Sequence, residues 1–123
     1  MSANRAKNSK PEVALRKALW HAGHRGYRLH YKRIPGRPDI SFVSRKLAIF
    51  VHGCFWHRCP KCAYTLPKTN RKFWKAKFDR NVIRDQRKVI DLQAIGWTVL
   101  TFWECDLASS LSPAVRKIKN TLG

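Results

Sequence analysis

The residues best suited to chemistry are concentrated between Phe50 and Cys62, in the stretch FVHGCFWHRCPKC. This stretch contains three of the four cysteines and two of the five histidines of the chain, together with the adjacent pair Phe55-Trp56. Thiolates and imidazoles gather where a metal ion is bound or a proton is transferred. Two adjacent aromatic side chains in a polar loop indicate insertion into a partner. The stretch therefore predicts a site that combines metal binding with acid–base chemistry.

The cysteines follow the pattern Cys54-x4-Cys59-x2-Cys62, and Cys105 stands alone much later in the chain. Four thiolates can close a tetrahedral shell around zinc at Zn–S distances of about 2.3 Å, and such a site would use every cysteine. A closed shell has a structural role, because it leaves no position open for a substrate. Free buried thiols and disulfides are the alternatives, and His57 could replace one cysteine as a ligand.

Asp39 stands at the start of an expected strand, opposite the end of the following strand at Val51-His52. A carboxylate in that position, with a backbone carbonyl as a second ligand, suits a magnesium ion. An ordinary turn aspartate is the alternative interpretation. His52 and His57 stand close by in sequence, and an imidazole oriented by a carboxylate can accept a proton from water.

Two further acids are singled out by their positions. Asp85 shares a helical face with Val82 and Val89, so it is expected to point inward. A lone buried charge is costly, and Asp85 therefore needs a partner, either a histidine or arginine of the site or a purely structural ion pair. Glu12 stands three residues after Ser9, as in a capping box, and that role accounts for it without catalysis.

Hydrophobic periodicity predicts the elements that position these residues. Residues 27–31 alternate as in a half-buried strand, whereas residues 47–51 are continuously apolar, as in a central strand covered on both faces. Helices are expected after the N-cap Ser9 as far as Gly23, over 71–94 and over 112–122, and further strands over 39–43 and 97–103. Trp97 and Trp103 share one face of the last strand and are expected in the core. The order predicts an α/β fold with a mixed sheet flanked by helices.

The composition predicts one domain over residues 1–123 and an anionic partner. Lysine and arginine number 26 against seven acids, a formal net charge of +19, which favours nucleic acid. Residues 1–8 are expected to form a flexible basic arm along a phosphate backbone. The chain has no apolar run long enough for a membrane span and no apolar signal segment, so we expect a cytoplasmic protein.

Six motifs, in the same order and over nearly the whole chain, resemble those of the very-short-patch repair (Vsr) endonucleases. They are Asn8-Ser9-Lys10-Pro11-Glu12, Gly36-Arg37-Pro38-Asp39, Val51-His52-Gly53-Cys54-Phe55-Trp56-His57, Phe73-Trp74, Asn81-Val82-x-x-Asp85 and Gly96-Trp97-x-Val99-Leu100-x-x-Trp103-Glu104-Cys105. The resemblance implies a restriction-endonuclease-like fold with a structural zinc site. It also implies a strand-specific nick 5′ to the thymine of a T:G mismatch, the product of 5-methylcytosine deamination.

The resemblance also implies roles for individual residues. Asp39 and the carbonyl of Val51 match the Mg²⁺ ligands, and Glu12 would reach that ion through water. His57 is similar to the residue that activates the attacking water, with Asp85 orienting a catalytic histidine and His52 near the scissile phosphate. The zinc ligands match Cys54, Cys59, Cys62 and Cys105. Restriction-like nucleases usually carry an acid and a lysine where Phe50 and His52 stand here, so the lysine mechanism does not transfer.

The aromatic residues that match the intercalating side chains of the family are Phe55, Trp56 and Trp74, with Met1 added by position. Intercalation unstacks base pairs at a cost that contacts to the bent DNA offset. Trp74 also fits a place in the core, since it begins the apolar stripe of its helix.

The partner implied by the resemblance is double-stranded DNA with a T:G mismatch, bound by a monomer at the bacterial nucleoid, with mismatch-repair proteins as candidate partners. One alternative is a related DNA nickase with another sequence or structure specificity. The other is a non-catalytic, zinc-stabilised DNA-binding module in which the acids only cap helices and form ion pairs.

Overall fold

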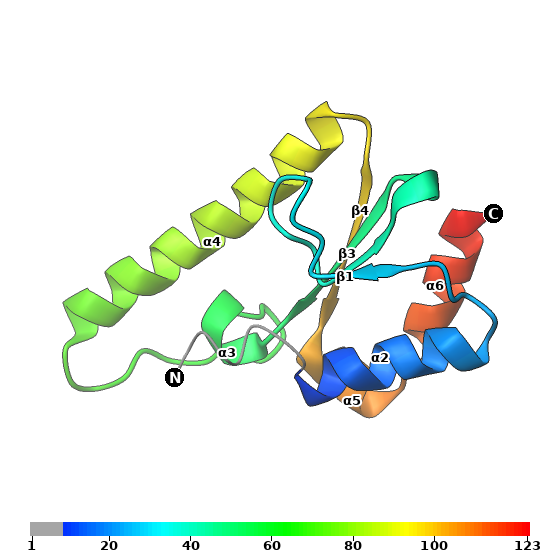
Figure 1. Cartoon of the computed structure of the whole chain (residues 1–123). Helices are drawn as coiled ribbons and strands as arrows, with labels where there is room; N and C mark the ends of the chain where they lie inside the picture. The colour runs from blue at the N-terminus through cyan, green and yellow to red at the C-terminus, as the bar shows by residue number, and fades with distance from the viewer. Residues whose placement is uncertain (1–8) are drawn as a thin grey trace.

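The computed structural model describes residues 9–123, apart from the side chain of Trp56, and forms one four-stranded sheet with helices on both faces (Figure 1). The strands are β1 (Arg28–Leu29), β2 (Ile40–Phe42), β3 (Leu47–His52) and β4 (Thr98–Trp103), and they lie in that order across the sheet. The pairs β1–β2 and β2–β3 are antiparallel, whereas β3–β4 is parallel. The predicted mixed α/β class is therefore confirmed. The expected arm at residues 1–8 lies outside the described residues.

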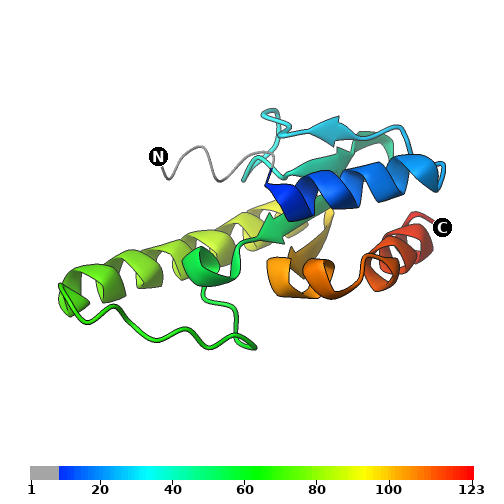
Figure 2. The ribbon, with the colours of Figure 1, turned by 90° about the horizontal axis from the view of Figure 1, so that it is seen from below.

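The helices divide between the two faces of the sheet. They are α2 (Lys10–His21), the 3₁₀ turn η1 (Val43–Arg45), α3 (Cys54–His57), α4 (Arg71–Ala94), α5 (Glu104–Ser109) and α6 (Ser112–Leu122). Figure 2 shows α4 along one side of the sheet and the helices α2, α5 and α6 on the other. The three long helices confirm the sequence prediction, whereas the short helices α3 and α5 were not predicted.

β3 is the central strand of the sheet and contributes to a hydrophobic core on each face. Leu47 and Ile49 belong to the core under α2 and α6, and the alternate residues Ala48 and Phe50 belong to the core under α4. All four side chains are buried, which confirms the prediction made from the continuous apolar run. Trp97 is also buried, in the α4 core, as expected, whereas Trp103 is only half-buried and contacts His52.

Helix α2 begins and ends where the sequence predicts. The Ser9 hydroxyl accepts a hydrogen bond from the Glu12 backbone N–H at 3.4 Å, and Pro11 occupies the first turn, where a missing N–H costs nothing. The helix ends at His21 with Ala22 as its C-cap, and Gly23 follows with φ +94°, a conformation that glycine adopts without strain. These caps fix the position of Glu12, which is buried.

The first strand differs from its prediction. A half-buried strand was expected over 27–31, but only Arg28–Leu29 pairs with β2, and Leu29 is 41% exposed. The strand ends because His30 adopts a left-handed backbone conformation with φ +49°. That conformation turns the His30 side chain toward Glu12 and Asp39. The alternation of polar and apolar residues in the sequence does not predict a residue with a left-handed backbone conformation.

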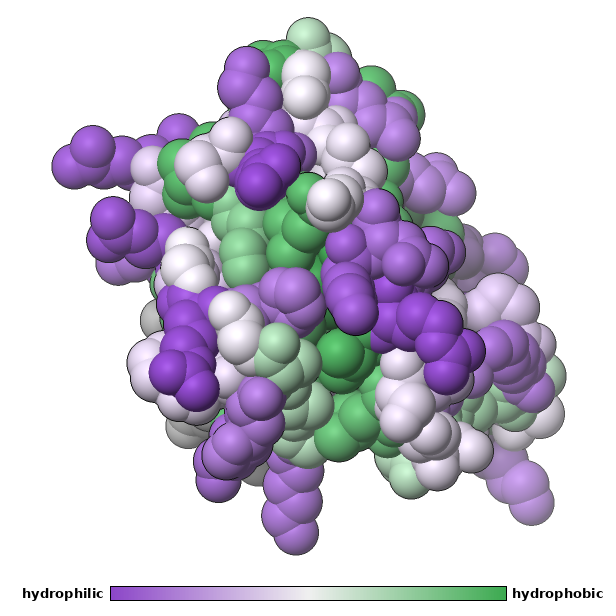
Figure 3. All heavy atoms as spheres, turned by 90° about the vertical axis from the view of Figure 1, so that its right-hand side faces the viewer, coloured by the Kyte–Doolittle hydropathy of each residue, from purple (hydrophilic) through white to green (hydrophobic). Residues whose placement is uncertain are grey.

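The face that carries α6 has hydrophilic side chains around a band of hydrophobic surface (Figure 3). Within residues 9–123, the helices include none that is long and apolar enough to cross a bilayer.

Replacing Ile49 with alanine should lower the free energy of unfolding by about 2–5 kcal/mol, because the side chain is fully buried in the central strand. Denaturant unfolding at constant metal concentration measures this change. Ile83→Ala is the matched control, since Ile83 is 63% exposed and its loss should change stability by only about 0.5 kcal/mol. Equal losses for the two variants would contradict the assignment of β3 as the core strand.

Candidate active site and metal centre

The pairing of β3 with β4 brings two distant segments of the chain together. The strands are parallel, and the last pair in their register is His52 and Trp103. Cys54 begins α3 two residues after His52, and Cys105 lies in the first turn of α5 two residues after Trp103. Because parallel strands end at the same edge of a sheet, both cysteines lie at that edge.

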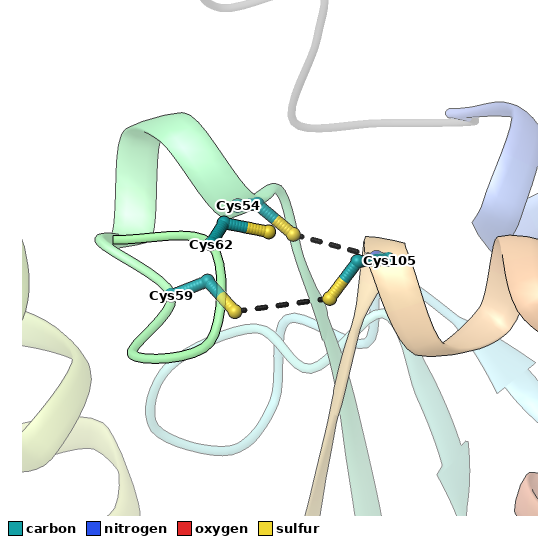
Figure 4. Close-up of side chains that lie close together, drawn as sticks. All are labelled: Cys54, Cys59, Cys62 and Cys105. Carbon is teal, nitrogen blue, oxygen red and sulfur yellow. Dashed lines mark hydrogen bonds between the residues drawn. The ribbon is translucent and has the colours of Figure 1, made fainter. Parts of the chain in front are cut away.

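The four cysteines form one compact cluster, as Figure 4 shows. Their sulfur atoms all lie within 4.8 Å of one another, and the Sγ atoms of Cys59 and Cys105 are 3.8 Å apart. The backbone N–H of Cys105 donates to Sγ of Cys54 at 3.3 Å. A tetrahedral site with Zn–S distances of about 2.3 Å separates its sulfur atoms by about 3.8 Å. The donor set therefore fits a thiophilic metal ion.

Two of the alternative arrangements of these cysteines, disulfides and a ligand role for His57, do not match the structure. All four thiols are free, so disulfides are absent from this cluster. His57 is paired with Asp85 and belongs to a separate group of candidate ligands. Burial raises the pKa of the Cys54 thiol to about 12, so a metal ion must displace the proton of Cys54 when it binds.

A second group joins α3 to the long helix α4. Nδ1 of His57 lies 2.5 Å from Oδ2 of Asp85, and both side chains are mostly shielded from solvent. Asp85 thus has the histidine partner that its inward position requires. With the Nδ1 proton donated to the carboxylate, Nε2 of His57 remains as an acceptor for a proton from water. The geometry is that of an imidazole held in one orientation by an acid.

His52 packs against His57 from the end of β3. The two rings are stacked at a centroid distance of 4.1 Å with an interplanar angle of 7°, and Trp103 contacts His52 edge-on at 5.2 Å. Burial lowers the pKa of His52 to about 4, and the nearby His57 adds to the effect. His52 is therefore neutral near pH 7, and it supports the His57 ring without adding a positive charge.

Asp39 lies beside Val51, where the predicted magnesium site requires it. The backbone N–H of Val51 donates to Oδ2 of Asp39 at 2.7 Å. The N–H and C=O groups of one strand residue face the same neighbouring strand, so the carbonyl of Val51 also faces the side on which Asp39 lies. Burial raises the pKa of Asp39 to about 6, although the Val51 hydrogen bond opposes the rise, and Glu12 raises the pKa further. A bound cation would stabilise both carboxylates.

Glu12 does more than cap its helix. Its backbone N–H bonds to Ser9, whereas its carboxylate points into the protein and contacts Nη1 of Arg16 at 3.2 Å and Nε2 of His30 at 3.1 Å. Together, Glu12, His30 and Asp39 form a third group of candidate metal ligands within 4.8 Å of one another.

Two residues near the site were missed in the sequence. His30 was assigned to the exposed face of a strand by alternation alone. Lys88 lies one turn beyond Asp85 on α4, and its charge lowers the pKa of both Asp39 and His52. Lys88 stands three residues after Asp85, and this helical spacing could have predicted that the two side chains lie on the same side of α4.

The aromatic residues singled out in the sequence meet at Phe78. Phe55 is half-buried and contacts the buried Phe78 edge-on at 5.2 Å, and Trp74 stacks on the same ring at 5.6 Å. The guanidinium carbon of Arg58 lies 4.3 Å from the Phe78 ring centroid. Met1 and the side chain of Trp56 lie outside the described part of the chain. Intercalation by these four residues stays a prediction.

A shallow, mainly basic groove lies between α4 and the loop at Gly36. Its helical lining is Arg80, Ile83, Arg84, Arg87, Lys88 and Asp91. The three arginines recur at helical spacing, so they project on one side of the helix. Such a row of guanidinium groups suits contact with successive phosphates.

Comparison with known proteins identifies relatives along the whole chain. Residues 1–63 match the family model described as DNA mismatch endonuclease Vsr. The type II nicking enzyme V.XorIIP of Xanthomonas oryzae is 45% identical over 122 residues, covering 99% of this chain and 88% of that protein. The type II nicking enzyme V.NmeDIP of Neisseria meningitidis is 40% identical over 99% of this chain and 82% of its own length. The DNA mismatch endonuclease Vsr of Escherichia coli is 42% identical over 81 residues, which are 66% of this chain and 52% of that protein.

The fold, the site and these relatives define an endodeoxyribonuclease, an enzyme that cuts within DNA strands. The chain belongs to the Vsr family of DNA mismatch endonucleases. This assignment favours an enzyme over the non-catalytic DNA-binding module that the sequence left open.

The cysteine cluster should bind one thiophilic metal ion per chain, and Cys105→Ser should lose most of it, because Cys105 is the ligand that joins α5 to the other three. Elemental analysis of the purified proteins measures the metal content. Asp39→Asn is the control and should keep the ion, since Asp39 belongs to a different group of ligands. Full metal content in the Cys105→Ser protein would contradict the four-cysteine site.

Proposed function

We propose that this protein nicks one strand of duplex DNA 5′ to the thymine of a T:G mismatch in a Mg²⁺-dependent reaction, as in very-short-patch repair. The observation that carries the proposal is the His57–Asp85 pair in a chain of the Vsr family. His57 stacks on His52 at the end of β3, and the preceding residue Val51 contacts Asp39. Hydrolysis of a phosphodiester needs a base for water and a positive charge at the phosphate. His57 can act as the base, and a cation held by Asp39 would supply the positive charge.

Asp39 and the carbonyl of Val51 would hold Mg²⁺, with Glu12 reaching it through water. When bound, Mg²⁺ neutralises phosphate charge and stabilises the charge that develops during cleavage. Nε2 of His57 accepts the proton of the attacking water, and Asp85 keeps the imidazole oriented and stabilises its protonated form. His52 stacks on the His57 ring and limits its movement. His52 would itself lie near the scissile phosphate.

We propose zinc as the ion held by Cys54, Cys59, Cys62 and Cys105. The chemistry of four thiolates at tetrahedral spacing supports zinc, and a closed shell makes its role structural. Such a site fixes α3 to α5 and thereby holds His57, which lies at the end of α3, at its distance from Asp85.

We further propose that Phe55, Trp56 and Trp74, with Met1, separate the bases beside the mismatch. The aromatic cluster around Phe78 would keep Phe55 and Trp74 close together, and the arginine row on α4 would hold the DNA backbone. Residues 1–123 would act as one restriction-endonuclease-like domain and bind DNA as a monomer. Its cellular location would be the nucleoid, where mismatch-repair proteins are candidate partners.

A second candidate function is nicking with another sequence or structure specificity. It is favoured by the names of two relatives that span nearly the whole chain, both of which are type II nicking enzymes. The bases around the cut site would then decide the substrate.

A nicking assay with end-labelled duplexes tests the proposed function. In Mg²⁺, duplexes with a T:G mismatch in several sequence contexts should be cut in the thymine strand on its 5′ side, whereas T:A duplexes should stay intact. Asp39→Asn should lower the rate by a factor on the order of 10² or more, because the charge that holds the ion is lost. Equal cutting of T:A and T:G duplexes would favour the second candidate, and an active Asp39→Asn protein would remove Asp39 from the mechanism.

Replacing His57 with alanine should reduce nicking by about 10²–10⁴-fold, because the base that accepts the water proton is removed. Duplex binding, measured in parallel by fluorescence anisotropy, should stay nearly unchanged. Asp85→Asn should lower the rate less than His57→Ala does, since the imidazole stays in place but loses its orienting charge. Unchanged nicking by the His57→Ala protein would show that another group activates water.

A further inference from the structure

We propose that His30 is a direct nitrogen ligand of the catalytic divalent ion beside Asp39, and that its other ring nitrogen donates to Glu12, which reaches the ion through water. This inference rests on the proposed function and deepens it, because it adds a ligand that the sequence and the family resemblance did not indicate. The nitrogen donor also determines which metal ions the site prefers.

The two ring nitrogens of His30 face different carboxylates. Nδ1 lies 3.8 Å from Oδ1 of Asp39, and Nε2 lies 3.1 Å from Oε2 of Glu12. Neighbouring donors of an octahedral ion with bond lengths of about 2.1 Å lie about 3.0 Å apart. A small movement of the Asp39 carboxylate would bring its oxygen and Nδ1 to that spacing, while the Nε2 proton is donated to Glu12 and fixes the ring.

Each of the three residues reaches the site from a different element. Glu12 comes from the first turn of α2, Asp39 immediately precedes β2, and His30 follows β1. The side chain of Glu12 is almost fully buried, whereas those of Asp39 and His30 are 13% and 17% exposed. The cluster is thus enclosed on the Glu12 side and retains access from solvent beside the other two residues, as a catalytic ion with water ligands requires.

The backbone of His30 is held in an unfavourable conformation that aims its side chain at this cluster. Its φ of +49° is uncommon for a residue other than glycine, and its N–H donates to the carbonyl of Asp39 at 3.1 Å. Strain of this kind persists where the surrounding structure enforces it, and it is concentrated at functional sites. The hydrogen bond fixes His30 and Asp39 relative to each other.

The nitrogen donor has a consequence for metal preference. Carboxylate, carbonyl and water oxygens suit Mg²⁺ and Mn²⁺, whereas an imidazole adds affinity for transition metals. A site with Glu12, Asp39 and His30 should therefore prefer Mn²⁺ to Mg²⁺ more strongly than a site with oxygen donors alone. Arg16, at 3.2 Å from Oε2 of Glu12, limits the negative charge of the site.

Electron spin echo spectroscopy of the full chain loaded with Mn²⁺ tests this ligand directly. Mn²⁺ is chosen because it favours oxygen and nitrogen donors and leaves the cysteine cluster to softer ions. The wild-type protein should show the ¹⁴N coupling of one directly bound imidazole. His30→Gln should lose that coupling and weaken Mn²⁺ binding at least about tenfold, with a smaller effect on Mg²⁺.

Two histidine variants serve as controls. His57→Gln should keep the coupling, because His57 belongs to the separate group with His52 and Asp85. His21→Gln replaces an exposed histidine at the end of α2 and should behave as the wild type. Circular dichroism establishes that each variant is folded.

Three results would overturn the proposal: wild-type protein without nitrogen coupling, His30→Gln with the coupling intact, or loss of the coupling in His57→Gln alone. The first needs no variant and is independent of folding. Failure of the proposed function is separate, since nicking without T:G specificity by a protein that shows the His30 coupling would refute the substrate and leave the ligand in place.

Discussion

The structure depends on the parallel pairing of β3 with β4. Their last register pair, His52 and Trp103, sets the point from which two short helices leave the sheet. One helix carries Cys54 and His57, and the other carries Cys105. The crossover between the two strands is α4, which carries Asp85 to the same edge. One strand pairing thus positions the sulfur cluster and the histidine–aspartate pair together, and neither group forms without it.

Most of the few acidic residues of this basic chain lie either in the candidate site or in exposed ion pairs. Three of the seven, Glu12, Asp39 and Asp85, lie in the candidate site and contact histidines. Three others form ion pairs on exposed surfaces, with Lys61, Lys75 and Arg87. Exposed pairs contribute little to stability, typically less than about 1 kcal/mol. The shielded carboxylates are therefore gathered in the candidate site, where a bound cation would stabilise them.

The sequence predicted most of the fold because its strongest signals are local. Caps at Ser9 and Gly23, the apolar run of β3 and the helical stripe of α4 each specify one element without reference to the others. The inward position of Asp85 also predicted its need for a partner. The sequence did not predict α5 or α3, since each is too short to show a period. His30 was misplaced because a left-handed backbone residue depends on tertiary contacts with Glu12 and Asp39, which no local pattern contains.

The late position of β4 in the chain has a consequence for biosynthesis. A ribosome-bound chain that has released only the segment through α4 holds three of the four sulfur atoms and a sheet without its last strand. Because Cys105 and Trp103 emerge afterwards, the nascent polypeptide cannot assemble the edge that carries the candidate site. The candidate site of a DNA-cutting enzyme therefore forms only after β4 has been synthesised.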